Sequence, residues 1–547
     1  MKKIYQQIIG KCIVIFSLLI FASCSKFLTI EPRGQVGDET LWSSELNADL
    51  FLNNIYSGLP GTFGTYDPPE NFSDNAMSAH SWGFSTTTIK TAIYTADNAP
   101  TQWGHYANIR KANIFIEKVG NSNLDAKWKE KRLAEARYLR AYYYSLLWTN
   151  HGGIPVITDI LNLGEQGDEV FRSRNTAEET FQFISTELES IKNSLPVFAE
   201  ASRASKGAAL ALKGWCELFW ASPLYNPDND LSRWSNAAST YKEIINLNAY
   251  QLFPEYNAQF MEENNWNVET IFAKAYLGGT ALGASREGLQ GTWIVGGQQL
   301  SWSGVDPSQE LIDEYFMANG LAIDAPGSGY NPQNPYANRE KRFYESIVYD
   351  GSVWAGSEII MKQGVGSRNE TDLASKNEST NTGYYIRKGL DPKYAINGPH
   401  MQSSANYIIF RYAEVLLAYA EAQNEATGPD QSIYDAINEV RDRVDLPPLA
   451  NGLTQEELRK AIHQERRVEM AFEDKRYLDL IRLKLAETKL NGHMHAMLIA
   501  QEGGVWKYKV IPATQGEMVF HPEKNYLWPI PQSAMDRNKN LTQNPGY

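Results

Sequence analysis

Cysteine is scarce in this chain of 547 residues, which contains only Cys12, Cys24 and Cys216. Cys12 lies inside an N-terminal apolar run, Cys24 directly follows that run, and Cys216 lies in the apolar stretch LKGWCELFW. Cys12 is expected to be removed together with an N-terminal signal peptide, and Cys24 is expected to carry lipid. A disulfide framework is therefore excluded, and Cys216 is expected to be a small buried hydrophobe.

The motifs that mark several large enzyme classes are also missing. The sequence contains no Walker A loop, no GxGxxG, no GxSxG elbow, no HExxH and no CxxC, so these classes have no support. His493 and His495 are two residues apart, a poor spacing for shared metal ligation on a helix. We therefore expect no metal, no cofactor and no catalytic residues.

A glycoside hydrolase is harder to exclude, because it needs only two carboxylates roughly 5 to 10 Å apart. Glu70 and Asp74 lie beside an aromatic loop and are the best available pair. An α-helical glycosidase that uses these two residues stays as an alternative to a non-catalytic protein.

Positive charge is in deficit. The formal net charge is −13, and removal of residues 1–23 leaves 48 basic against 64 acidic residues, or −16. Such a body repels phosphate backbones, which argues against nucleic acid as a partner. No apolar run of roughly 18 residues follows residue 25, so we expect no spanning helix in the mature body.

The N-terminus has the features of a bacterial lipoprotein leader. Lys2, Lys3 and Lys11 precede an uncharged apolar run that ends in FASC, which predicts a signal peptide over 1–23. The FASC ending resembles a lipobox, with Phe21 where leucine is usual, and makes Cys24 the lipidated residue. Three acyl tails at about 0.8 kcal/mol per buried methylene make such an anchor permanent. Ser25 and Lys26 do not resemble an inner-membrane retention signal, so the outer membrane is favoured.

Helical patterns dominate on both sides of an irregular middle. Apolar residues return every three or four positions over 101–248, which predicts amphipathic helices. One helix is expected from about Lys127 to NHGGIP, and another begins after an N-cap at Asn175 or Thr176. Two more are expected over 206–220 and 233–246. The segment 253–405 is rich in glycine, asparagine and proline, and helices return at 408–426, 432–444 and 454–486. We expect an N-terminal helical region over 24–250 and a C-terminal region over 251–547.

The fold class predicted from this pattern is mainly α. Recurring short helical hairpins indicate a tetratricopeptide-like repeat scaffold, in which each pair buries one face on the next. The 253–405 segment is expected to be a large loop-rich, partly β region that binds the ligand. An irregular all-α bundle is the alternative architecture.

Several segments, in order, resemble the SusD/RagB family of surface lipoproteins. The resemblance runs nearly end to end through CSKFLTIEP, QWGHYANIRKANIFIEKV, AEARYLRAYYYSLLWTNHGGIPVI, DPSQELIDEYFMANG, NPYANREKRFYESIVYDGSVW, TGYYIRKGLDP, FRYAEVLLAYAEAQNE, INEVRDRVDLPPL, HQERRVEMAFEDKRYLDLIRLK and YLWPIPQSAMDRNKNLTQNPGY. NREKRF departs from the Asp-Pro pair common before that arginine, and IRLK lacks the tryptophan that often follows the arginine.

The resemblance implies a function as well as a fold. Members of this family capture a glycan, or less often a peptide-type nutrient, and sit as a lid on a TonB-dependent (SusC-like) outer-membrane transporter. The expected protein is therefore a lipid-anchored, surface-exposed glycan-binding protein. A protein-binding or adhesive surface lipoprotein is a further alternative, because helical repeats often bind proteins.

Glycan binding calls for exposed aromatic rings edged by polar side chains, since a sugar ring stacks its C–H face on an aromatic face while its hydroxyls need hydrogen bonds. Trp148, Trp215 and Trp220 have helical spacing and are expected in the core. The loop-borne candidates for the aromatic platform are Trp82, Trp293, Trp302, Tyr66, Phe72 and Trp354. The candidate polar partners are Asn71, Asp74, Asn75, Arg286, Gln298 and Gln299.

Overall fold

A computed structural model describes residues 38–62, 64–280, 283–374, 379–395 and 402–547. Helices dominate and the strands form small two-stranded sheets, so the predicted mainly α fold class is confirmed. The predicted signal peptide, Cys24 and the rest of 1–37 lie outside the described residues. Within the described residues, no helix combines the length and apolarity needed to cross a membrane.

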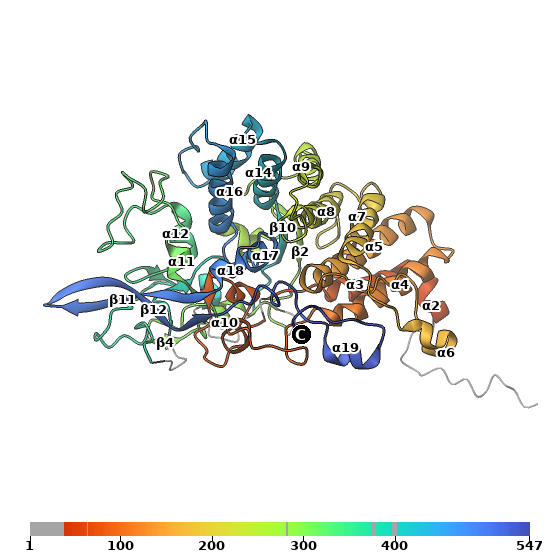
Figure 1. The fold of residues 1–547 in the computed structure, drawn as a ribbon, viewed down its shortest axis with the longest axis horizontal. Coiled ribbons are helices and arrows are strands. Elements are labelled where there is room, and N and C mark those ends of the chain that lie inside the picture. The colour runs from red at the N-terminus through yellow and green to blue at the C-terminus, as the bar shows by residue number, and fades with distance from the viewer. Residues whose placement is uncertain (1–37, 63, 281–282, 375–378, 396–401) are drawn as a thin grey trace, which may run out of the picture.

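The N-terminal half is a series of helices that pack in chain order (Figure 1). The longest, α5, begins after the N-cap Asp125 and ends at Gly152, where NHGGIP predicted its end. The next long helix, α7, begins after Thr176, which forms a capping box with Glu179. These helices are α2 (Asp38–Trp42), α3 (Glu45–Ser57), α4 (Tyr106–Gly120), α5 (Ala126–His151), α6 (Leu163–Gln166), α7 (Ala177–Ile191), α8 (Lys206–Ala221) and α9 (Leu231–Asn246).

Short elements make up the loops of the first half and the middle of the chain. The first group is η2 (Pro69–Phe72), β1 (Ala76–Met77), η3 (Ser85–Ile89), η4 (Trp103–His105), η5 (Gly167–Val170), η6 (Ala258–Phe260) and η7 (Glu262–Asn264). The second is β2 (Thr270–Lys274), α10 (Arg286–Gln290), β3 (Ile294–Val295), β4 (Gln298–Gln299), β5 (Asp306–Pro307), α11 (Gln309–Ile312), α12 (Lys341–Ser346), β6 (Ile347–Val348), β7 (Val353–Trp354), β8 (Ser357–Glu358), β9 (Tyr385–Ile386) and α13 (Pro392–Ala395). The middle is thus loop-rich and partly β, as predicted.

The last part of the chain returns to helices and ends with a long hairpin. Its elements are β10 (Tyr407–Arg411), α14 (Tyr412–Thr427), α15 (Gln431–Asp442), α16 (Gln455–Glu469), α17 (Arg476–Arg482), α18 (Ala486–Lys489), β11 (Gly492–Glu502), β12 (Val505–Met518) and α19 (Gln532–Arg537). Helix α14 packs on α9 and so continues the stack of the first half. Whether this stack is a tetratricopeptide-like repeat stays a prediction.

Two helix boundaries and one residue pair differ from the sequence prediction. The helix expected from Ile408 begins only at Tyr412, because 407–411 pair with β2 as a strand. The helix expected over 454–486 stops after Glu469, and Phe472 and Asp474 then adopt positive φ angles of 64° and 60°. His493 and His495 lie on strand β11 rather than on a helix, and His495 Nδ1 lies 2.6 Å from Glu310 Oε1.

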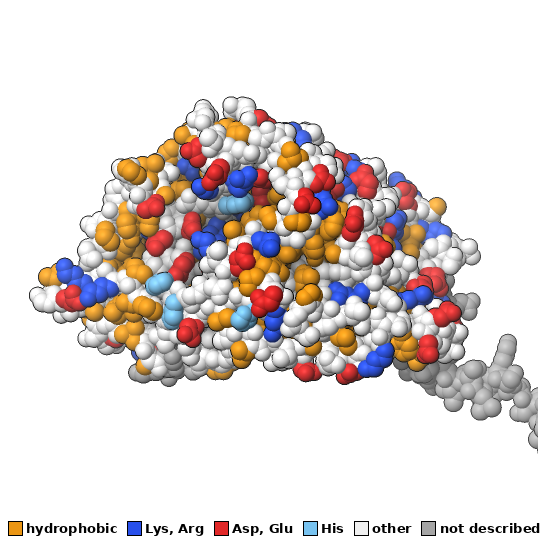
Figure 2. All heavy atoms as spheres, viewed as in Figure 1, with side chains coloured by type: hydrophobic (Ala, Val, Ile, Leu, Met, Phe, Trp, Pro, Cys, Tyr) orange, Lys and Arg blue, Asp and Glu red, His pale blue; other side chains and the backbone are white. Residues whose placement is uncertain are grey.

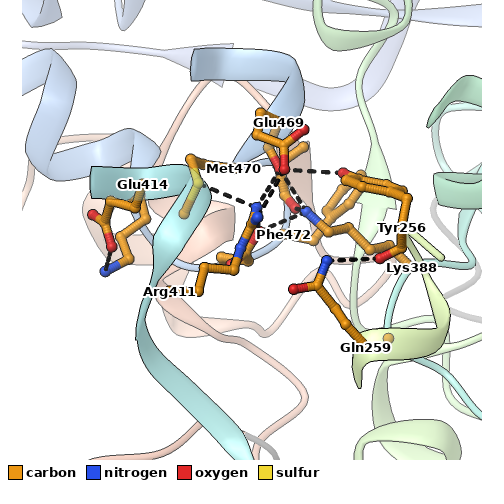
Figure 3. A network of polar contacts seen from close by, with 12 residues as sticks. Tyr256, Gln259, Lys388, Arg411, Glu414, Glu469, Met470 and Phe472 are labelled. Carbon is orange, nitrogen blue, oxygen red and sulfur yellow. Dashed lines mark hydrogen bonds and ion pairs between the residues drawn. The ribbon is translucent and has the colours of Figure 1, made fainter. Parts of the chain in front are cut away.

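A buried ion network joins β10 to the turn after α16 (Figure 3). The Arg411 side chain is 1% exposed, and its guanidinium donates to Glu269 Oε1 at 2.7 Å and to Glu473 Oε2 at 2.8 Å. It also donates to the side chain and the backbone carbonyl of Glu469. Lys388 Nζ reaches the same carbonyl at 2.8 Å and Glu473 Oε1 at 2.6 Å.

The cations of this network keep its acids ionised. Burial alone would raise the pKa of Glu469, but Arg443, Arg411 and Arg342 hold it well below its usual range. Burial alone would also raise the pKa of Glu473, but Arg411 and Lys388 lower it to about 2. Because each buried charge meets an opposite charge, the network can exist inside the protein.

Replacement of Arg411 by methionine should destabilise the protein strongly. The variant R411M keeps much of the side-chain volume but leaves buried carboxylates without their cation, which typically costs about 3–5 kcal/mol. Urea unfolding measures the loss. The exposed pair Lys460–Glu456 provides the control, since K460Q should leave the unfolding midpoint unchanged. Equal midpoints for R411M and the parent protein would contradict a stabilising network.

Candidate functional site

Two loops that are far apart in the sequence meet through the β1–β5 pair. Ala76 pairs with Pro307 and Met77 with Asp306. Just beyond this pair, the Ala79 amide donates to the Ser303 carbonyl at 3.1 Å. The pairing places the loop that carries Trp82 against the loop that carries Trp302.

A third loop joins them at Gly304. The Asn71 side-chain amide donates to the Gly304 carbonyl at 2.8 Å. The backbone of Tyr66 passes so close that a Cβ on Gly304 would lie 2.4 Å from the Tyr66 carbonyl oxygen and 2.6 Å from that of Leu289. Only glycine fits this crossing, and it brings the Tyr66 ring to the other two loops.

Four rings from these loops form one cluster, which we call the platform: Tyr66, His80, Trp82 and Trp302. The Tyr66 ring stands edge-on to the two indoles, with centroids 6.1 Å from Trp82 and 6.3 Å from Trp302. The His80 imidazole stacks on Trp82 at 4.7 Å. Trp82 is 60% exposed, Trp302 is 37% exposed and Tyr66 is half-buried. The platform therefore offers flat aromatic surface to a ligand.

His80 is the buried member of the platform, with 3% of its surface exposed. Burial lowers its pKa below the usual value, against a backbone hydrogen bond to Trp302 and the charge of Asp67, which act to raise it. The imidazole is thus neutral at physiological pH. Its Nε2 makes no hydrogen bond to the described residues, but that atom is buried like the rest of the ring. His80 therefore contributes to the platform by stacking on Trp82.

Three predicted platform residues are buried instead. Trp293, Trp354 and Phe72 are 6%, 4% and 8% exposed. The Arg368 guanidinium covers the Trp293 ring at 4.5 Å, and Arg387 lies over Trp354 at 5.6 Å. Phe72 packs edge-on against Tyr477. The prediction was wrong for these rings, because flanking glycines and polar residues indicate a loop but do not say which way a side chain points.

Most of the predicted polar partners are also buried, so the exposure expected of them was wrong. Arg286 is 6% exposed and donates to the Phe472 carbonyl. Asn71 holds the Gly304 carbonyl, and Asn75 bridges Glu70 and Arg467. Asp74 is 2% exposed and receives two hydrogen bonds from Arg476. These residues support the loops from behind.

Gln298 and Gln299 lie on the β3–β4 hairpin, which is part of the loop that carries Trp302. Gln298 is exposed and Gln299 is half-buried. Their role as ligand contacts stays a prediction.

The carboxylates considered for hydrolysis are structural. Glu70 is 1% exposed and accepts hydrogen bonds from the Asn75 side chain and from the backbone amides of Phe472 and Asp474. Arg467 and Arg476 hold Asp74 in ion pairs of 3.0 and 2.7 Å. Since both acids are enclosed by protein groups, this pair cannot reach a substrate. Across the described part of the chain, no three His, Cys, Asp or Glu side chains are grouped to hold a metal ion.

His80 is the platform residue that sequence reasoning missed. His80 stands two residues before Trp82 in HSWGF. The Gly83 amide donates to the His80 carbonyl, so this segment is a tight turn, and no pattern in it indicates that the two rings stack.

Two family models match the chain. The model described as "SusD family" matches residues 268–547, and "Starch-binding associating with outer membrane" matches 27–214. SusD-like protein P2 of Formosa agariphila is 26% identical over 93% of this chain and 89% of its own length. Starch-binding protein SusD of Bacteroides thetaiotaomicron is 24% identical over 82% and 78%. A SusD-like carbohydrate binding protein from Bacteroides fragilis, of known structure, is 28% identical with a TM-score of 0.78 and covers 92% of this chain and 100% of its own.

Stability should fall with rising pH because of Glu70. Burial, and after it the charge of Asp474, raise the pKa of Glu70 to about 7. Three hydrogen bonds to its carboxyl group act in the opposite direction but are outweighed. The folded protein therefore keeps a proton that the unfolded chain releases above about pH 4.5, and the stabilisation from that proton is lost as pH rises through about 7. In E70Q, the difference in unfolding free energy between pH 5 and pH 8 should shrink by roughly 3 kcal/mol. Urea unfolding at both pH values measures this difference.

The exposed Glu178 supplies the matched control, because E178Q should keep the pH dependence of the parent protein. An E70Q protein with the full parental loss of stability above pH 5 would show that Glu70 is not the group responsible.

The platform should also depend on Gly304. The variant G304A must move the Tyr66 backbone, so we expect an altered near-ultraviolet circular dichroism spectrum with unchanged far-ultraviolet signal. Gly104 has open space around its Cβ position, and G104A should leave both spectra unchanged. A parental near-ultraviolet spectrum for G304A would mean that the crossing tolerates a side chain.

Proposed function

The chain belongs to the SusD family, and from that premise we propose that it is a cell-surface lipoprotein that captures oligo- or polysaccharide and hands it to a TonB-dependent outer-membrane transporter. The single observation that supports capture most directly is the platform. Two exposed indoles lie close to the Tyr66 ring, and the buried His80 imidazole stacks on one of them. Such a surface binds sugar through C–H stacking.

The location and the partner depend on other support. The FASC leader motif favours lipidation of Cys24, and one matching model carries the words "associating with outer membrane". The TonB-dependent (SusC-like) transporter as recipient follows from the family resemblance. Mass spectrometry of membrane-extracted protein tests the anchor, since three acyl chains on Cys24 add a defined mass.

A binding role is favoured over hydrolysis. Among the named relatives are a starch-binding protein and a carbohydrate binding protein. In this chain, the carboxylate pair that suggested hydrolysis serves to hold loops together. An adhesive role is less supported, because the exposed indoles of Trp82 and Trp302 both lie against Tyr66 and present stacking surface for a sugar.

Removal of the exposed indoles should weaken glycan binding. W82A and W302A each delete stacking area, so we expect at least a tenfold loss of affinity, or about 1.4 kcal/mol, for each variant. The melting temperature should change little, because both rings are solvent-accessible. Affinity gel electrophoresis over a polysaccharide panel identifies a ligand, and isothermal titration calorimetry with that polysaccharide measures the loss.

Phe198 provides a control of similar type, since its ring is 77% exposed and belongs to a different loop. F198A should bind as the parent protein does. Parental affinity in W82A and W302A would remove the platform from the binding site, and release of reducing ends by the purified protein would favour a hydrolase. Binding to no glycan would favour the adhesive role or a peptide ligand.

A further inference from the structure

The two segments that carry the platform lack residues with a permanent positive charge. Residues 60–89 include Tyr66, His80 and Trp82, residues 288–308 include Trp302, and neither segment has a lysine or arginine. The absence is informative because proteins recognise carboxylates and sulfates mainly through arginine and lysine side chains.

The acids in these segments do not offer a site for a cation either. The Asp67 carboxylate accepts hydrogen bonds from the Ser85 amide at 2.6 Å, from the Ser85 hydroxyl and from the Asn71 amide at 2.9 Å. Asp74 is paired with Arg467 and Arg476. Burial raises the pKa of Glu70 and of Asp306. Asp67 therefore leaves the local charge slightly negative.

Among the described residues, the cations that flank or contact these segments are each held by protein groups. Lys90 directly follows η3, but its Nζ is buried and donates to the Ala76 carbonyl at 2.8 Å. Arg368 is exposed, and its guanidinium lies over the Trp293 ring, in the hairpin that leads to Trp302. Acidic and basic side chains are interspersed over the face of the molecule drawn in Figure 2, without a large basic patch.

We propose that the platform selects an uncharged glycan and rejects glycans that carry uronate or sulfate groups. This selectivity rests on the proposed function of the platform. A neutral sugar can stack on the exposed faces of Trp82 and Trp302 without any charged partner. An anionic sugar would lose water next to the Asp67 carboxylate without gaining a cation. The net charge of −16 on the body that follows residue 23 adds repulsion at longer range.

The test compares neutral and acidic polysaccharides on the full soluble chain from Ser25 onwards. The neutral probes are amylopectin, laminarin, xyloglucan, mannan, inulin and dextran, and the acidic probes are polygalacturonate, alginate and dextran sulfate. We expect every ligand whose affinity falls at least tenfold in W82A or W302A to be neutral. Its affinity should change less than twofold between 50 and 500 mM NaCl, since no counterions are released. Dextran sulfate and dextran share a backbone, so this pair isolates the effect of charge.

Arg368 gives a second readout. Arg368 is an exposed cation that lies over Trp293, and a neutral ligand does not need it. R368Q should therefore leave the affinity for a neutral ligand within twofold, as should the control R537Q on α19. Platform-dependent binding of an acidic polysaccharide, a salt-sensitive affinity, or a tenfold loss in R368Q alone would each overturn the selectivity. These results would leave the platform as the glycan site. Binding that is unaffected by W82A and W302A, or no binding at all, would instead remove the platform function, and the selectivity with it.

Discussion

The position of the candidate site depends on burial of a charged network without a net unpaired charge. Arg411 can lie inside the protein because Glu269, Glu469 and Glu473 surround its guanidinium. To bring Glu473 into that shell, the chain must leave the helix after Glu469 and turn sharply. The positive φ angles at Phe472 and Asp474 are the backbone consequence of this turn.

The same turn holds the loop that carries Tyr66. The amides of Phe472 and Asp474 donate to the Glu70 carboxyl group, and the Glu70 amide donates back to the Asp474 carboxylate at 3.0 Å. Thr62 adds a hydrogen bond to Asp474. A series of buried polar contacts thus links the ion network to the loops, and the exposed rings are held by groups that a ligand never touches.

The polar residues of the loops point into the protein. Asn71, Asp74 and Asn75 hydrogen-bond to other protein groups, which makes the loops rigid. His80 is buried with them and stacks on the Trp82 ring. Rigid loops suit a stacking surface, because ordering mobile loops upon binding would reduce affinity. The absence of lysine and arginine from the same segments gives this surface a chemical preference as well as a shape.

The sequence by itself determined the helices, the loop-rich middle and the family. Local signals suffice for these features: glycines and Pro155 end α5, Thr176 and Glu179 cap α7, and ordered motifs extend over most of the chain. It also identified Trp82, Trp302 and Tyr66 as loop-borne rings. Only the tertiary structure decided which rings face solvent, because that depends on contacts between residues far apart in the sequence. Arg368 covers Trp293, and the β1–β5 pair brings Trp82 to Trp302. No local pattern encodes those contacts, since each is set by how the loops are packed against the charged core.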